Sequence, residues 1–406
     1  AEGGPLDSTQ RICCPPPSTS DDGERLRIGR RRLRWQARAT LWAASSLKAV
    51  RCCGRIVGQG EHAQGDGVPI RRTGDGYGAR AGYAGLATCG SVWACPRCSA
   101  VIAAERSIEI GEAVRTCVDA GGSVYLVTLT MRHHAGLPLA HLFEGLSRGW
   151  RKSVGDVAFT GRGPRREIRR GRTVERPGRS GERDTFGVAG LVRVIEATWG
   201  RPSDGGAGWH LHIHCLIFCI GPLADAVIEA DEIAKHVGIS AGDINREMIG
   251  TAALGAQLFS RWCAGVTKCG LPRPLGAGFD IRRIADGGAE FIGTYLTKAT
   301  LDVAARVGAE VGAGVNTKTA RGVVNVAPFA LLNELVTDLD APRLGFRTPR
   351  RWSWISLPEG GSAVVDLESG EVTEVRAPGD WAIWHEWEEA TKGRQQIRWS
   401  SRVKSP

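Results

Sequence analysis

Alternating apolar and polar residues mark the strands expected in this chain. The run from Trp209 to Ile220 is apolar except at His210, His212 and His214, which occupy every second position. Successive side chains of a strand point to opposite faces, so the three imidazoles share one face. The residues between them are apolar and suit packing against a core. The pattern therefore predicts a half-buried strand that carries a row of histidines.

The same kind of pattern predicts the rest of the fold. Strands are expected at 123–131, 191–199 and 279–284, and the turn residues at 201–206 join the second of these to the histidine strand as an antiparallel hairpin. Apolar residues three and four apart predict helices at 99–118, 139–150, 222–237, 242–265, 288–300 and 327–338. Helices thus interleave with strands of which one pair is antiparallel. We expect an α+β fold in which helices flank a central antiparallel sheet.

Shifts in composition predict five parts in the chain. These are a disordered segment at 1–29, a basic, cysteine-rich region at 30–120, a domain at 121–300 that carries the histidines, a linker at 301–326, and a mainly helical C-terminal extension at 327–406. Within the third part, residues 161–186 hold nine arginines and almost no apolar residue, so we expect a flexible arginine-rich loop there.

Net charge narrows the class of partner. The chain carries a formal charge of +10, and 45 of its 53 basic residues are arginine. Arginine suits phosphate groups and base edges, so a nucleic acid is the expected partner. No run is long enough to span a membrane and no secretory leader pattern is present, so a cytoplasmic protein without a membrane partner is expected. The arginines predicted to contact DNA are Arg165, Arg166, Arg169, Arg170 and Arg172.

The histidine strand predicts a metal site. Imidazole is a common metal ligand near neutral pH, and Glu196 lies on the strand predicted to pair with this one. If the turn between the strands is tight, Glu196 can lie opposite His212 or His214. Two imidazoles and one carboxylate suit a hard divalent ion such as Mg²⁺ or Mn²⁺ and leave positions open for a phosphodiester. His210 is a further candidate ligand.

A tyrosine on a predicted helix is the candidate nucleophile. Tyr295 and Lys298 are three residues apart and share a helix face. A phenol has a pKa near 10 and attacks a phosphate well only if that phosphate is already polarised. A metal ion at the histidines would supply this polarisation, and Lys298 would add to it.

The cysteines predict a second metal. Cys89, Cys95 and Cys98 supply three thiolates, and the fourth ligand is Cys53 or, as the second choice, Cys52 beside it. A structural Zn²⁺ held by these thiolates would let a glycine-rich region fold.

Together these motifs resemble those of HUH endonucleases. His212-Ile213-His214 is similar to their histidine motif, Tyr295-Leu296-Thr297-Lys298 to their helix-borne tyrosine motif, and residues 126–130 to their first-strand motif. Order and spacing resemble the rolling-circle replication initiators of bacterial plasmids from high-GC bacteria. Residues 89–98 and 392–400 are similar to the cysteine motif and the C-terminal signature of that branch.

The resemblance implies a metal-dependent nickase and strand transferase. Residues 121–300 would form the endonuclease domain, with His212 and His214 as metal ligands. Tyr295 would attack one strand at the origin, giving a 5′-phosphotyrosyl link and a free 3′-OH. The implied partners are double-stranded origin DNA, single-stranded DNA, and the host helicase and replication machinery. A dimer on DNA is also expected.

One position departs from the family, and two other functions compete. Related initiators often place a glutamate four residues before the tyrosine, where this chain has Phe291; Glu290, five residues before, lies on another face of the helix. A different carboxylate or a second tyrosine would therefore serve termination. The alternatives are another HUH nickase, either a conjugative relaxase or a transposase, and a non-catalytic, zinc-dependent DNA-binding regulator.

Overall fold

The computed structural model describes residues 37–38, 40–42, 44–57, 70–74, 80–202, 205–223, 245–284, 317–318, 324–329, 331–332, 352–356, 362–366, 372–376 and 378–400. These residues belong to two compact units. The first comprises 1–104, 300–315 and 328–393, and the second comprises 105–299, 316–327 and 394–406. The helix predicted at 288–300 and nearly all of the one predicted at 222–237 lie outside the described residues.

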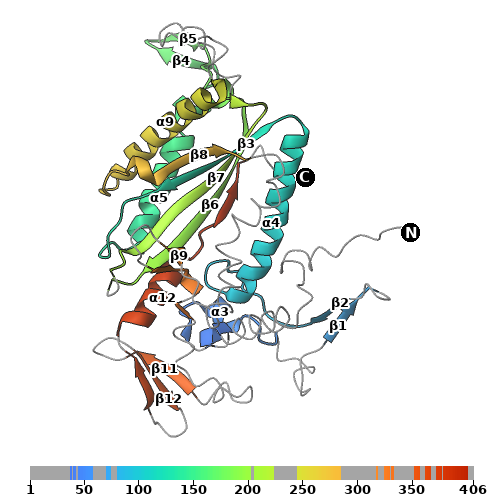
Figure 1. The fold of residues 1–406 in the computed structure, drawn as a ribbon, viewed down its shortest axis with the longest axis vertical. Helices are drawn as coiled ribbons and strands as arrows, with labels where there is room; N and C mark the ends of the chain where they lie inside the picture. Colours follow the sequence, from blue (N-terminus) through green and yellow to red (C-terminus); the bar gives the residue numbers. More distant parts are fainter. Residues whose placement is uncertain are drawn as a thin grey trace. The chain divides into compact units, whose positions relative to one another are not determined.

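The second unit is built on a seven-stranded antiparallel sheet. The strand order is β8-β3-β7-β6-β10-β9, and β14 also pairs with β6. The strands are β3 (Ser123–Thr130), β6 (Val188–Gly200), β7 (Gly208–Cys219), β8 (Phe279–Arg283), β9 (Thr317–Lys318), β10 (Val324–Val326) and β14 (Ile397–Trp399). The predicted hairpin is confirmed as β6 and β7, and the strands predicted at 123–131 and 279–284 are confirmed as β3 and β8 (Figure 1).

Helices cover both faces of this sheet, as the α+β prediction requires (Figure 1). Helices α5 (Leu139–Val154) and α9 (Arg246–Thr267) pack against each other on one face. They approach closely where Gly149 meets Gly265, because a Cβ atom on Gly265 would lie 2.7 Å from the Gly149 Cα atom. Any larger residue there would force the two helices apart.

The other face of the sheet packs against the second half of helix α4 (Pro96–Asp119). Ile110 and Val114 of this helix form a buried cluster with side chains from three strands, which are Val124, Leu126, Val192, Val194, Leu216 and Phe218. Alternation along each strand places Thr128, Glu196 and His214 on this same face, two residues beyond the last apolar side chain. The histidine row therefore continues the surface that α4 covers.

Residues 161–186 differ from the flexible loop that we expected. They contain two strands, β4 (Arg165–Arg169) and β5 (Arg172–Arg176), which pair antiparallel, and the short helix α7 (Glu182–Thr185). Helix α6 (Val157–Thr160) precedes them, and the turn η6 (Gly276–Gly278) precedes β8. The high charge and low apolar content of this segment led us to expect a loop. The pairing of β4 with β5 gives no apolar pattern, because a two-stranded ribbon is held by backbone hydrogen bonds and buries little core.

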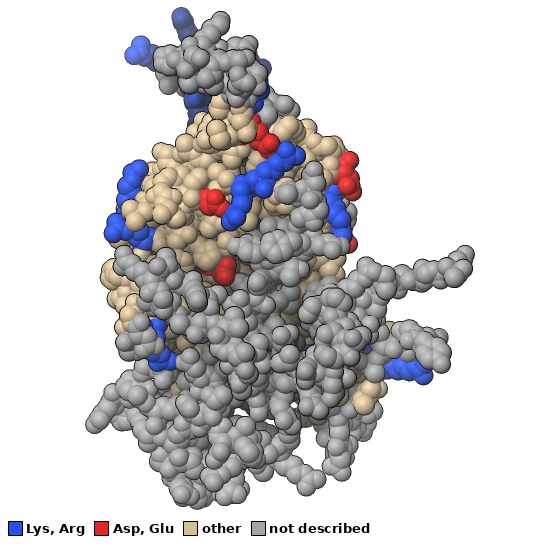
Figure 2. Space-filling view, in the orientation of Figure 1, with Lys and Arg blue, Asp and Glu red and all other residues tan. Residues whose placement is uncertain are grey.

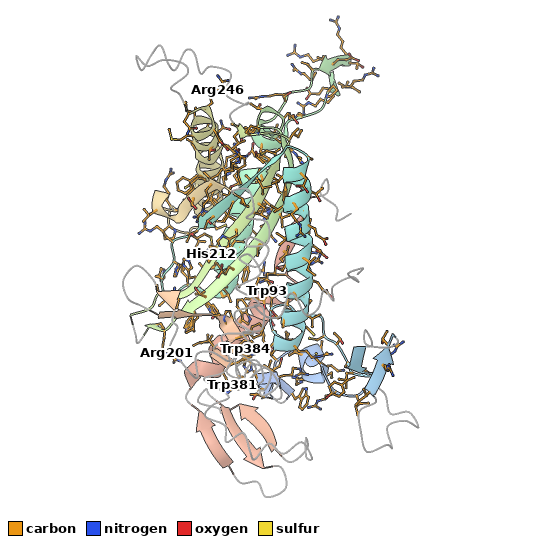
Figure 3. The ribbon with its side chains drawn as sticks, turned by 45° about the vertical axis from the view of Figure 1, so that its right-hand side comes forward. Trp93, Arg201, His212, Arg246, Trp381 and Trp384 are labelled. Atoms are coloured by element: carbon orange, nitrogen blue, oxygen red, sulfur yellow. The ribbon has the colours of Figure 1, made fainter. Side chains whose placement is uncertain are left out.

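The first unit contains helix α3 (Lys48–Cys52), the start of α4, helix α12 (Pro378–Thr391), the hairpin of β1 (Ile70–Thr73) with β2 (Arg80–Tyr83), and a three-stranded sheet of β11 (Trp352–Ser356), β12 (Ser362–Asp366) and β13 (Val372–Arg376). Trp93, Trp381 and Trp384 are labelled around α12 in Figure 3. The ring of Trp93 contacts that of Trp387 edge-on at 5.4 Å. None of the helices that the structure describes combines the length and apolar character needed to cross a membrane.

Two predicted segments are corrected by the strands found in them. The C-terminal extension is not mainly helical, because 352–376 holds β11, β12 and β13. The expected linker at 301–326 holds β9 and β10, which extend the large sheet beyond β6. All five strands are five residues or shorter, too short for a period of two to stand out in the sequence.

Candidate metal centres

The register of the hairpin brings a carboxylate to the histidines. Glu196 of β6 lies directly opposite His212 of β7, and His214 is two residues further along the same face. The outer edge of β6 pairs with β14 up to Val194 and with β10 from Trp199, so Glu196 lies between the two flanking strands. Figure 3 labels His212 on the large sheet. This arrangement is one of the two alternatives that the sequence left open for Glu196.

Three donor atoms of these side chains converge on one point. Nε2 of His212 lies 2.9 Å from Oε2 of Glu196, Nε2 of His214 lies 3.1 Å from the same oxygen, and the two nitrogens are 3.1 Å apart. Two ligands at right angles, each about 2.1 Å from a metal ion, are about 3.0 Å apart, whereas a tetrahedral pair would be about 3.4 Å apart. The distances fit one face of an octahedron, which leaves three positions for other ligands.

The charge states of the group also suit a cation. Burial raises the pKa of Glu196, but hydrogen bonds to His212 and His214 outweigh it and bring this pKa well below its usual value. Burial lowers the pKa of His214, and the neighbouring imidazole of His212 lowers it further. At neutral pH the group therefore presents a carboxylate and a neutral His214 imidazole, which are the forms that bind metals.

Thr128 of β3 orients His214. The Thr128 hydroxyl lies 3.1 Å from Nδ1 of His214, directly across from it in the β3–β7 register. When Nδ1 donates its proton to this hydroxyl, the lone pair of Nε2 is free for the metal group. Among the described residues His212 has no equivalent support, because none of them forms a hydrogen bond with its buried Nδ1.

His210 lies outside the group of three and contacts His133 instead. Its Nδ1 is 2.8 Å from Nε2 of His133, whose Nδ1 is 3.0 Å from the carbonyl oxygen of Ala207. A carbonyl can only accept, so His133 Nδ1 donates to it and His133 Nε2 accepts the proton of His210 Nδ1. Burial, together with the neighbouring imidazoles of His212 and His133, lowers the pKa of His210 to about 3. His210 is thus held neutral beside the group.

Sequence reasoning missed His133 as part of this row. It follows the end of β3, and its place beside His210 depends on how β3 pairs with β7, which no spacing in the sequence reveals. The predicted Tyr295 and Lys298, with Glu290 and Phe291, lie outside the described residues. The predicted DNA-binding arginines lie on β4, β5 and the turn between them.

Four cysteines of the first unit form a second group. Sγ of Cys53 is 3.7 Å from Sγ of Cys95 and 3.6 Å from Sγ of Cys98, and Sγ of Cys89 is 3.6 Å from that of Cys98. Thiolates about 2.3 Å from a tetrahedral Zn²⁺ are about 3.8 Å apart, so the group fits this ion. Cys52 is exposed and lies outside the group.

Three of the four thiols are buried, and hydrogen bonds join the group. Cys53 and Cys95 have no exposed surface and Cys98 is 4% exposed. Hydrogen bonds with Cys89 and Cys98 raise the pKa of Cys95, while those with Cys89 and Cys95 lower the pKa of Cys98. Four thiolates this close need a cation to be stable together, because like charges disfavour ionisation.

Helix α12 holds the segments that carry these cysteines. The buried Glu388 carboxylate accepts hydrogen bonds from the Ser45 hydroxyl and from the backbone N–H and hydroxyl of Ser46, just before α3. The indole N–H of Trp387 donates to the carbonyl of Trp93, two residues before Cys95. The segments that carry the cysteines are therefore held by residues nearly 300 positions or more later in the chain.

Comparison with known proteins gives two relatives and no structure. The chain is 31% identical over 334 residues to a Streptomyces lividans protein named "Protein rep". This match covers 78% of this chain and 62% of the Streptomyces protein. The chain is also 36% identical over 146 residues to a "Neomycin resistance protein" of Streptomyces cyanogenus. That match covers 34% of this chain and 31% of the relative. The chain thus spans less than two thirds of either relative. No family model and no solved structure matches it.

Proposed function

We propose that this chain initiates rolling-circle replication of a plasmid as an HUH-type, metal-dependent nickase and strand transferase. The observation that carries the proposal is the convergence of Glu196, His212 and His214, with donor atoms 2.9–3.1 Å apart and open positions beside them. The similarity to the Streptomyces protein named "Protein rep" over 78% of the chain supports a role in replication.

The described residues would hold and orient a divalent ion. Glu196 supplies negative charge, while His214, oriented by Thr128, and His212 supply imidazole nitrogens. Held by these residues, Mg²⁺ or Mn²⁺ would polarise the scissile phosphodiester and stabilise the charge that develops on it. His210 is a further candidate ligand in this proposal, and its burial lowers its pKa and keeps it neutral.

Tyr295 and Lys298 complete the proposed reaction from the segment that follows β8. The phenolic oxygen of Tyr295 forms a bond to phosphorus as the bond from phosphorus to the 3′ oxygen breaks. The phenol loses its proton, and the departing oxygen takes one up to become a 3′-OH. Lys298 adds positive charge beside the phosphate. The resulting phosphotyrosyl bond keeps the free energy of the phosphodiester for a later strand transfer.

The remaining parts of the chain would serve binding. Zn²⁺ at Cys53, Cys89, Cys95 and Cys98 stabilises the first unit, and its closed set of four ligands suits a structural rather than a catalytic ion. The arginines of β4 and β5 would contact origin DNA, both double-stranded and single-stranded. A host helicase and the replication machinery would then extend the 3′-OH in the cytoplasm, with a dimer on the origin.

The direct test uses DNA from the element that carries the gene. Supercoiled plasmid with the neighbouring origin is incubated with the protein and Mn²⁺. We expect nicked circles with protein attached to the 5′ end, and no nicking by Tyr295→Phe. Tyr83→Phe is the matched control, because it removes the same hydroxyl from a tyrosine that is 64% exposed in β2. Nicking that persists in Tyr295→Phe would exclude this nucleophile.

The competing functions predict other outcomes. A regulator binds the origin but leaves the circle intact with every metal, which would overturn the proposal. A relaxase or transposase nicks at sites other than a replication origin. The similarity to the neomycin resistance protein covers about a third of this chain, and neither metal group points to antibiotic chemistry, so we do not extend that name to this chain.

A further inference from the structure

The arginine-rich hairpin of the second unit is a regular ribbon with a tight turn. Strands β4 and β5 are joined by Arg170 and Gly171, which have φ angles of 51° and 74°. Positive φ at both positions is typical of a turn whose twist matches that of the strands. Arg170 is the one non-glycine residue with positive φ in the described part of the chain. A strained backbone therefore holds an arginine at the tip.

The two faces of this ribbon differ in charge. The arginine face consists of Arg165, Glu167, Arg169, Arg172, Val174 and Arg176, which alternation places on one side. The opposite face consists of Arg166, Ile168, Thr173 and Glu175. There Arg166 and Glu175 form an ion pair at 3.0 Å, so that face carries no net charge. The arginine face holds four arginines and one glutamate.

Two like-charged pairs lie directly across the arginine face. Arg165 is opposite Arg176, and Arg169 is opposite Arg172. Like charges in these positions destabilise a strand pair. Glu167 forms ion pairs with Arg165 and, at 3.5 Å, with Arg176, which relieves one pair. The arginine face keeps a surplus of positive charge, which an anion from outside the ribbon would neutralise.

We propose that the arginine face lies in the major groove of duplex DNA, with one arginine pair on each phosphate backbone. Four residues separate Arg165 from Arg169, which places the two pairs about 14 Å apart at about 3.4 Å per residue. The major groove is about 12 Å wide and admits a two-stranded ribbon, whereas the minor groove is about 6 Å wide. This inference deepens the proposed function by naming the surface and the groove through which the origin is held.

The ribbon is placed to reach DNA. Figure 1 shows β4 and β5 projecting from the end of the large sheet within the second unit, and Figure 2 shows Lys and Arg side chains at this end. On the arginine face, the side chains of Arg165 and Arg176 are 48% and 43% exposed, so both are accessible to a ligand. Arginine also matches phosphate with two parallel hydrogen bonds, which fixes the ribbon as well as binding it.

The experiment measures how duplex binding depends on salt. Arg165→Gln with Arg176→Gln removes one pair from the arginine face. Each lost phosphate contact should lower the slope of log K against log salt by about 0.9, so we expect a decrease of about 1.8. Affinity at moderate salt should fall about 10- to 100-fold. Fluorescence anisotropy with an origin duplex of about 30 base pairs, at several salt concentrations, gives both values.

Two controls separate the face from bulk charge. Arg148→Gln with Arg151→Gln removes the same charge from exposed positions on α5, and Arg166→Gln changes the opposite face of the ribbon. Both should keep the wild-type salt slope. An unchanged slope in the arginine-face variant, or an equal decrease in the α5 control, would overturn the inference.

A second readout keeps this inference apart from the proposed nickase. Cleavage of a single-stranded origin oligonucleotide by the wild-type protein with Mn²⁺ reports on the metal group separately, because the ribbon contributes no ligand to that group. If the wild-type protein cleaves nothing but the slopes differ as expected, the nickase proposal fails and the ribbon inference stands. If cleavage occurs but the slopes are equal, the reverse holds.

Discussion

The two metal-binding groups of this protein are built on opposite plans. Of the four cysteines of the first unit, three are buried; the four come from two segments, at 53 and at 89–98, and fill a tetrahedron by themselves. Glu196, His212 and His214 of the second unit come from one hairpin of an existing sheet and fill half of an octahedron. The cysteine group uses all four coordination positions of an ion and so serves folding, whereas the histidine group leaves positions for a substrate. Each plan predicts a different response to damage.

The largest expected effect is the loss of the first unit when its ion is lost. Cys95→Ser with Cys98→Ser removes two ligands, and structural zinc contributes on the order of 10 kcal/mol to small zinc-binding folds. We expect residues 44–104 to become sensitive to protease and the zinc content to fall to zero, while the large sheet stays resistant. Limited proteolysis with mass spectrometry measures this. Cys52→Ser, at an exposed thiol, should leave both values unchanged. Resistance in the double variant would mean that no ion supports this unit.

The opposite result is expected at the open group. Glu196→Gln keeps the shape of the side chain but removes its charge, so Mn²⁺ affinity should fall at least about 100-fold and nicking should disappear. The fold should persist, because the hairpin is held by ladder hydrogen bonds and by its own core. Electron paramagnetic resonance gives the affinity and circular dichroism the fold. Glu144→Gln, at an exposed position of α5, is the control. Unfolding of Glu196→Gln would erase the contrast between the two groups.

Acid should weaken the metal-free second unit. His210 has a pKa of about 3 in the fold, below the ordinary 6.5, so below pH 6.5 the unfolded chain binds more protons than the folded one. The free energy of unfolding therefore decreases as the pH falls, by about 2 kcal/mol between pH 6.5 and 5.0 from this group. Urea unfolding of metal-free protein, read by pulse proteolysis, measures the change. His210→Gln should lose this part of the pH dependence; an equal dependence in the variant would contradict the assignment.

The smallest effect tests the support of one ligand. Thr128→Val keeps the shape of the side chain but removes the hydroxyl that accepts from His214, and we expect Mn²⁺ affinity to fall about tenfold. Thr130→Val is the matched control, since Thr130 lies opposite His212 on the same strand face but its hydroxyl makes no such bond in the described structure. A similar loss in both variants would point to a general change of β3 instead.

How far the sequence predicts these features depends on how local they are. The hairpin of β6 and β7 is predictable, because alternation and a turn lie within thirty residues. The pairing of Glu196 with a histidine is predictable only as two alternatives, since a one-residue slip would turn its side chain to the other face. Cys53 is a candidate from its spacing to the other cysteines, but its selection over Cys52 needs the packing of α3.

Contacts that join distant segments escape prediction for a physical reason. Glu388 and Ser46 are 342 positions apart, and the identity of neither residue indicates which residue it contacts. His133 reaches His210 only through the β3–β7 register. The strands of the C-terminal extension are short, and their hydrogen bonds rather than their side chains define them. In each case the information lies in which backbones meet, which a single sequence does not carry.

The two closing elements, α12 and β14, also bear on the order of synthesis. Helix α12 secures the cysteine segments of one unit, and β14, a few residues later, pairs with the strand that bears Glu196 in the other. A ribosome makes both elements after every described ligand of the two groups. Until residues near 400 have left the ribosome, the nascent chain therefore lacks the α12 contacts to the cysteine segments and the pairing of β14 with β6. A chain that stopped before α12 would carry every described ligand of both groups and would lack the two elements that hold their segments in place.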